Sequence, residues 1–181
     1  MMRLKLAAAL TFGLIVPAYA DIDADFTMAN RIFGQVAPNA TISDIDGEWL
    51  PLTLLSNVKG EDPEPGIAAS LLERICGNDP VRGAVFTSLD DASFEMTAPN
   101  SRGELTYRFD WVSGSQFYRS FDPAALFSLR KFDAIEGERG VEMRARTLQA
   151  ATSQINIYRI SPDLLALAEP GHVELFGRCP Q

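Results

Sequence analysis

The stretch from Val81 to Phe121 reads VRGAVFTSLDDASFEMTAPNSRGELTYRFDWVSGSQFYRSF, with short apolar and polar alternations separated by turn-sized gaps. The clearest alternation places four apolar residues on one face: Leu105, Tyr107, Phe109 and Trp111. A period of two is expected of a strand with one buried face. The gaps are rich in residues that form turns. The stretch therefore predicts an antiparallel meander with strands near 83–89, 92–98, 103–112 and 115–121.

Before the meander, the sequence predicts two helices and a strand. Helical spacing of apolar residues runs from Ala24 to Gln35, and Gly47 to Val58 reads as a strand interrupted by Pro51. A charged loop, Lys59 to Gly66, follows. Residues 67–76 then form an apolar stripe typical of a helix, with Gly77 as its C-terminal stop.

After the meander, Asp122 and Pro123 are typical of a helix start, and a short helix is expected to reach about Lys131. Alternation predicts a strand over 141–146, and β-branched residues predict another over 152–160. A cap followed by proline predicts a helical turn over 164–168, and the last strand is expected over 172–179.

Together these segments predict a mostly β (α+β) fold of about eight strands, with three or four short helices packed on it. An antiparallel sheet of that size tends to curl, and its edges must be covered or closed. We therefore expect a strongly bent antiparallel sheet or a partly closed barrel, with the helix over 67–76 packed against it.

The first twenty residues have the three parts of a secretory signal. Arg3 and Lys5 are basic, residues 6–16 are apolar, and Ala18-Tyr19-Ala20 is a small-x-small cleavage site. Cleavage after Ala20 would leave residues 21–181 as a single β-rich domain. No cysteine for lipid attachment and no later long apolar run is seen, so we expect a periplasmic or secreted protein with no transmembrane segment or lipid anchor.

The net charge is negative. The chain carries a formal −8, and removing Arg3 and Lys5 with the signal leaves −10. Nucleic acids and anionic membranes need a basic surface that releases their counterions, so both are disfavoured as partners.

The chain has two cysteines, Cys76 and Cys179. An even count in an exported protein predicts a disulfide, which here would join the helix before the meander to the last strand. A redox or metal role needs a nearby thiol or a second histidine, and the sequence has neither.

Signals for catalysis are weak. His172 is the only histidine, and no G-x-S-x-G motif accompanies it. The fragment from Asp44 to Gly47 fails as an EF-hand because Ile42 and Thr53 occupy ligand positions. Five carboxylates lie on or beside predicted strands and could serve a hydrolase: Asp90, Asp91, Glu95, Asp110 and Glu142. We predict no catalytic residue, metal or cofactor.

The best candidates for a ligand site are aromatic. Tyr107, Phe109 and Trp111 share a face with Phe86, Phe94 and Phe117 on neighbouring strands. They form either plain core or, in a deeply curved sheet, the wall of a concave site. Arg144 and Arg146 on the predicted 141–146 strand could receive a carboxylate headgroup or pair with acidic residues across the sheet.

Gly47-Glu48-Trp49, and Arg178 at the end of the last strand, resemble the lipocalin pattern. In that family a G-x-W opens the first barrel strand and a C-terminal arginine packs on its tryptophan; a disulfide reaching the C-terminus also occurs. The resemblance covers a few residues at the two ends, and the helix over 67–76 departs from it. It implies, as an analogy, a barrel that binds a small apolar ligand.

Three hypotheses follow. The first is a non-catalytic exported protein that binds a partner protein or an envelope component. The second is a lipocalin-like binder of a small apolar ligand on the concave aromatic face. The third is a carboxylate-based hydrolase.

Overall fold

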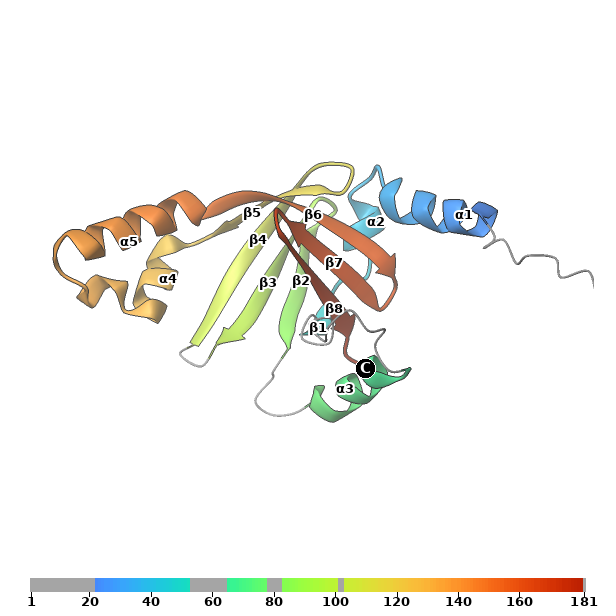
Figure 1. Cartoon of the computed structure of the whole chain (residues 1–181), viewed down its shortest axis with the longest axis horizontal. Coiled ribbons are helices and arrows are strands. Elements are labelled where there is room, and N and C mark those ends of the chain that lie inside the picture. Colours follow the sequence, from blue (N-terminus) through green and yellow to red (C-terminus); the bar gives the residue numbers. More distant parts are fainter. Residues whose placement is uncertain (1–21, 53–64, 78–82, 101–102, 181) are drawn as a thin grey trace, which may run out of the picture.

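The computed structural model describes residues 22–52, 65–77, 83–100 and 103–180. Eight antiparallel strands form a closed barrel in which each strand pairs with the next and β8 pairs with β1 (Figure 1). The strands are β1 (Gly47–Pro51), β2 (Ala84–Asp90), β3 (Ser93–Asn100), β4 (Gly103–Ser113), β5 (Gln116–Phe121), β6 (Thr152–Ser161), β7 (Leu164–Glu169) and β8 (His172–Arg178). The expected β-rich fold with a barrel and short helices is confirmed. The predicted signal, residues 1–20, and the predicted loop up to residue 64 lie outside the described residues.

The helices lie around the barrel. They are α1 (Ile22–Phe33), α2 (Asn39–Ile42), α3 (Ile67–Ile75), α4 (Pro123–Arg130), the 3₁₀ turn η2 (Phe132–Ala134) and α5 (Gly137–Ala150). Figure 1 shows α4 and α5 extending from one side of the barrel, α1 from the opposite side, and α3 next to the C-terminus.

The meander predicted from the alternation is present as β2 to β5. Its register places Phe94 opposite Phe109, and Trp111 opposite Phe117. Phe94 and Phe109 stack with their ring centroids 4.7 Å apart inside the barrel. The lumen is filled by a buried cluster that includes Trp49, Phe86, Phe94, Phe109, Phe117, Ile155, Ile157, Leu165 and Phe176. Burial of this apolar surface is the main favourable term for folding.

A second apolar cluster lies outside the barrel wall. Leu50 and Leu52 face outward from β1 and its extension and pack against α3. The predicted disulfide is confirmed: Cys76 at the end of α3 bonds to Cys179 just after β8, with the two Cα atoms 5.4 Å apart. The bond holds α3 against the strands that close the barrel.

Two element predictions are wrong. Residues 141–146 lie within α5 and form no strand; the segment is rich in strong helix formers, which outweigh an alternation carried by only three apolar residues. Residues 164–168 lie within β7 and form no helical turn. Leu165 and Leu167 face the lumen while Leu164 packs in the outer cluster, so both faces are apolar and the period of two is hidden.

The segment between β5 and β6, which we call the helical arm (residues 122–150), contains α4, η2 and α5. Asp122 caps α4 as predicted, because its carboxylate accepts a hydrogen bond from the Ala124 amide at 2.8 Å. The arm leaves and rejoins the barrel at neighbouring positions, since the Phe121 amide donates to the Ala151 carbonyl at 3.1 Å. The β5–β6 ladder is therefore complete without it.

The two ends of the barrel differ. At the end that we call the closed end, α2 packs residues such as Ile42 into the core, and the Trp49 indole nitrogen donates to the Ile45 carbonyl at 2.8 Å. At the opposite end, the mouth, β5 leads into the helical arm and the β7–β8 turn brings Glu169 opposite His172. The mouth is where the lumen is not filled.

Candidate functional site

A cavity of about 240 Å³ lies in the mouth. Phe109 and Phe176, both buried in the core cluster, are among its lining residues and separate it from the filled part of the lumen. Its other lining residues are Pro51, Ala84, Met96, Ala98, Pro99, Tyr107, Arg119, Leu167, Glu169 and Glu174. The cavity is thus mostly apolar, with a few polar groups, which is the usual composition of a small-molecule site.

Strand alternation directs the charged groups into the lumen. Arg119 lies on β5 two residues after Phe117, a core residue, and so shares its inward face. In the same way Glu169 follows Leu167 on β7, and Glu174 precedes Phe176 on β8. Three strands therefore bring one guanidinium and two carboxylates to the same cavity.

Arg119 and Glu169 form a bidentate ion pair inside the mouth. The two Nη–Oε distances are 2.5 and 3.1 Å. The guanidinium also lies over the Tyr107 ring, with its central carbon 5.6 Å from the centroid. Paired and stacked in this way, Arg119 has its charge balanced within the protein.

Glu174 is half-buried and lacks such a partner. Among the described residues its carboxylate makes neither a hydrogen bond nor a salt bridge. Burial raises the pKa of Glu174; His172 opposes this increase, and the nearby Glu169 adds to it. Among the described residues of the mouth, the Glu169 carboxylate is thus paired with a cation and the Glu174 carboxylate is not.

Tyr107 presents its phenol to the same cavity. Burial raises the pKa of Tyr107, and the charges of Arg119 and Arg130 act in the opposite direction. Within the described part of the chain, its hydroxyl has no hydrogen-bond partner, so it is available to a ligand. Its ring packs edge-on against Phe121, with the centroids 5.7 Å apart.

The structure separates the predicted site residues. Tyr107 and Phe109 line the cavity, whereas Trp111 packs nearer the closed end, where its indole nitrogen donates to the Gly114 carbonyl at 3.0 Å. Arg144 and Arg146 lie on α5 in the helical arm. Arg144 donates to the Phe132 and Ile135 carbonyls, and Arg146 pairs with Glu142 four residues earlier. A binding role for these two arginines stays a prediction.

Sequence reasoning did not find the trio of Arg119, Glu169 and Glu174. A signal for it existed: each residue has the strand parity of an aromatic or aliphatic core neighbour. A charged residue on an otherwise apolar face marks either a mouth or a buried polar site.

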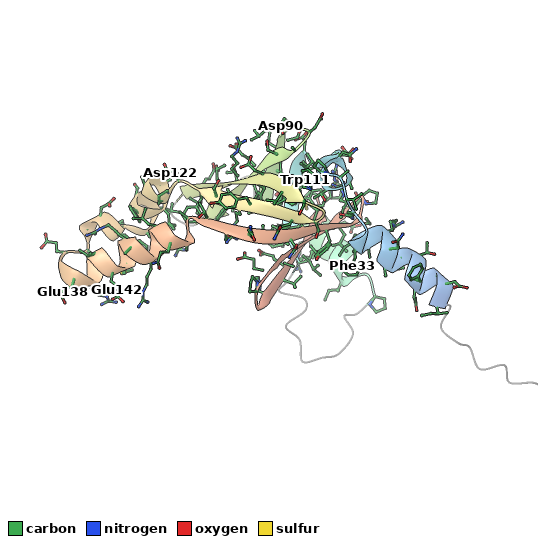
Figure 2. The ribbon with its side chains drawn as sticks, turned by 90° about the horizontal axis from the view of Figure 1, so that it is seen from above. Phe33, Asp90, Trp111, Asp122, Glu138 and Glu142 are labelled. Atoms are coloured by element: carbon green, nitrogen blue, oxygen red, sulfur yellow. A yellow bond between two sulfur atoms is a disulfide. The ribbon has the colours of Figure 1, made fainter. Side chains whose placement is uncertain are left out.

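Of the carboxylates proposed for a hydrolase, Asp90, Glu95 and Asp110 lie near Arg108 on the β2–β4 side of the barrel, outside the mouth cavity. Asp90 accepts a hydrogen bond from the Ala92 amide within the β2–β3 turn, and Asp110 pairs with Arg108 on the same strand. Figure 2 shows Glu142 on the helical arm, far from Asp90. In the described ranges no three His, Cys, Asp or Glu side chains are grouped to hold a metal ion.

Glu169 and Glu174 are two carboxylates in one cavity, which an acid–base mechanism would require. Both oxygens of Glu169, however, are held by Arg119. A carboxylate bound in this way is a poor base or nucleophile, because reaction would break a bidentate pair.

At the closed end, two arginines lie over Trp49. The guanidinium carbons of Arg159 and Arg178 are 5.3 and 4.8 Å from its ring centroid, and Arg178 also pairs with Asp44 at 3.3 Å. The contact between Arg178 and Trp49 is the one that the lipocalin resemblance implies. Burial and the charge of Arg178 lower the pKa of Arg159. These contacts fix the first and last strands together.

Helix α1 has an exposed apolar surface. Ile22, Phe26, Met28 and Phe33 are all more than half exposed. Phe33 makes an edge-on contact with Tyr158 of β6, with ring centroids 5.2 Å apart, and Figure 2 shows α1 projecting away from the barrel beyond it. An apolar helix surface of this kind is a typical feature of a protein–protein contact.

No protein-family model, curated protein or solved structure matches the chain. None of the helices in the described segments is long and apolar enough to cross a membrane. The interpretation of the mouth therefore rests on its own residues.

Proposed function

We propose that the protein is an exported, non-catalytic binding protein that holds one small amphipathic molecule in the mouth of its barrel. The observation that carries this proposal is the mouth cavity, whose lining combines apolar side chains with the Glu174 carboxylate and the Tyr107 hydroxyl. A few polar groups in an apolar cavity orient a ligand, while the apolar surface supplies affinity.

The filled lumen limits the size of the ligand. The aromatic cluster below Phe109 and Phe176 leaves the cavity at about 240 Å³, just under the range of about 300–1,000 Å³ that drug-sized ligands occupy. A lipocalin-like ligand lying deep in the barrel would have to displace packed core residues. The proposed ligand is therefore compact, with any longer chain projecting to solvent.

The disulfide supports an oxidising compartment. Bonds of this kind persist in the periplasm and outside the cell and are rare in the cytosol. The secretory signal expected over residues 1–20 agrees with this, and export is part of the proposal.

The proposal is tested by NMR titration with 2-phenylethanol, a neutral amphipathic probe of suitable size. We expect saturable shifts of backbone amides around Tyr107, Leu167 and Glu174. Ala98→Trp should fill the cavity and abolish them, whereas the control Val85→Trp, at an exposed outward position on β2, should not. Absence of saturable shifts with 2-phenylethanol and with its charged analogues would refute the proposal.

A second candidate function, binding of a partner protein or envelope component, is favoured by the exposed apolar surface of α1. Its test is affinity capture from an envelope extract with the mature protein as bait. A specific partner should be lost with Phe26→Ser and kept with the neighbouring control Thr27→Ser. Equal capture by both variants would exclude α1 as the binding surface.

A further inference from the structure

We propose that the mouth cavity selects a small organic cation, an amine with a compact hydrocarbon part, and that the Glu174 carboxylate is the counter-ion of its ammonium group. This inference rests on the function proposed above and adds the charge and chemical class of the ligand.

Among the described residues, the charge that the mouth leaves unbalanced is negative. Arg119 is the one cation among the described residues that line the cavity, and Glu169 binds it through both carboxylate oxygens. An anionic headgroup would have to compete with this internal pair. Glu174 has no such partner in the described part of the chain, so the unmatched charge of the cavity is negative.

The Glu174 carboxylate is half-buried in the mouth. Glu174 lies between the floor residue Phe176 and the exposed His172 at the rim, two residues away on either side. The half-buried carboxylate has lost part of its hydration, and the nearby His172 offsets that loss only in part. An ammonium group entering the mouth would supply both the opposite charge and hydrogen-bond donors.

The apolar wall of the cavity would receive the hydrocarbon part of the ligand. Met96, Ala98, Leu167 and Phe176 present apolar surface to the cavity. A hydrocarbon group placed against them loses contact with water, and this favours binding. The combination of apolar wall and single free carboxylate matches an alkyl or arylalkyl amine, and it disfavours a fatty acid or an organic phosphate.

Charged and titratable groups from four strands face the mouth: Tyr107 on β4, Arg119 on β5, Glu169 on β7, and His172 with Glu174 on β8. Arg130, on α4, acts electrostatically on Tyr107 from outside the lining. Within the part of the lining that the structure describes, only Glu174 offers an unpaired charge, so a single substitution can test the proposal.

The experiment compares three probes of the same shape by NMR titration at pH 7: 2-phenylethylamine, 2-phenylethanol and phenylacetate. We expect the amine to bind at least about tenfold more tightly than the alcohol, the size of one charge-assisted hydrogen bond, and phenylacetate to bind most weakly. Glu174→Gln keeps the shape of the side chain and should bring the affinity for the amine down to that for the alcohol.

The control variant is Glu104→Gln, which removes an exposed carboxylate from the start of β4 without changing the cavity lining. It should leave the preference for the amine intact, because long-range attraction between exposed charges is screened by salt. If Glu104→Gln lowered the affinity for the amine as much as Glu174→Gln does, binding would depend on the net charge of the protein and not on pairing with Glu174. That result would overturn the inference.

The outcomes separate this inference from the function on which it rests. If the alcohol or phenylacetate binds at the mouth as tightly as the amine, the site exists and the proposed class of ligand is wrong. If none of the three probes gives saturable shifts at the mouth, the proposed function itself fails.

Discussion

At Glu174 the folded carboxyl keeps its proton to a higher pH than the same group in the unfolded chain, because burial raises its pKa. Ionisation of Glu174 therefore favours the unfolded state. Its favourable contribution to stability is fully present below the unfolded pKa, near 4.5, and is lost as the pH rises through the folded pKa.

Glu174→Gln should consequently raise the melting temperature at pH 7, and this gain should shrink as the pH is lowered toward 4.5. Thermal unfolding followed by circular dichroism at a series of pH values measures the difference. Glu104→Gln serves as the exposed control. A gain for Glu174→Gln that did not change with pH would contradict the assigned cause.

Trp49 provides a second prediction at the residue scale. Trp49→Phe removes the buried hydrogen bond to the Ile45 carbonyl and weakens the contacts with Arg159 and Arg178. We expect the free energy of unfolding in urea to fall by about 2–4 kcal/mol, from one buried hydrogen bond, two cation–π contacts and lost burial.

The matched control is Trp111→Phe, which loses one half-buried hydrogen bond to the Gly114 carbonyl and should have a smaller effect. If the free energy of unfolding fell equally in the two variants, the arginine contacts at the closed end would contribute little to stability.

Single residues were only partly predictable from the sequence. The alternation correctly placed Tyr107 and Phe109 on the concave face, because a period of two assigns side chains to faces without knowledge of their neighbours. It could not say that Trp111, on the same face, lies toward the other end of the barrel. Nor could it pair Arg119 with Glu169, since that contact joins residues 50 positions apart.

Among the elements, α3 is the one whose attachment depends on a covalent bond. Its apolar residues Leu71 and Leu72 pack in the outer cluster, and Cys76 ties its end to Cys179. Cys76→Ser would open a loop with a sequence separation of 103. The chain-entropy model then gives a loss of about 4–5 kcal/mol in the free energy of unfolding.

Urea denaturation of Cys76→Ser, beside reduced and oxidised wild type, checks this prediction. The variant should match the reduced wild type, and both should retain affinity for a mouth ligand, because neither cysteine lines the cavity. Equal stability of the reduced and oxidised wild type would contradict it.

The elements that sequence reasoning missed share a cause. The buried residues of α5, Gly140 and Thr147, are small or polar, so the sequence has no apolar stripe that indicates the helix. In β7, by contrast, both faces are apolar, because one face packs in the core cluster of the lumen and the other in the outer cluster. Periodicity fails wherever an element has no contrast between its two faces.

For the molecule as a whole, the sequence indicated a curled sheet but could not decide its closure. Closure depends on the pairing of β1 with β8, in which Trp49 lies opposite Arg178. A local sequence pattern does not indicate contacts between strands at the two ends of a chain. The G-x-W and the C-terminal arginine were a signal for this pairing, and their contact is present in the structure.

Export is a prediction that concerns the whole molecule. Protein recovered after secretion should begin at Asp21, and its intact mass should be lower by two hydrogens than that of the reduced chain, because Cys76 and Cys179 are joined. Denaturing mass spectrometry before and after reduction measures both. A retained Met1 in the secreted fraction would rule out cleavage after Ala20.

The helical arm has one more consequence, for the integrity of the chain. Because the Phe121 amide bonds to the Ala151 carbonyl, the strand pairing of the barrel does not run through residues 122–150. A protease that cut once between α4 and α5 would produce two fragments, one with β1 to β5 and one with β6 to β8, that remain paired in the same barrel through β5–β6 and β8–β1. Cys76 would lie in one fragment and Cys179 in the other, so that without a reductant the nicked molecule would still migrate as a single species.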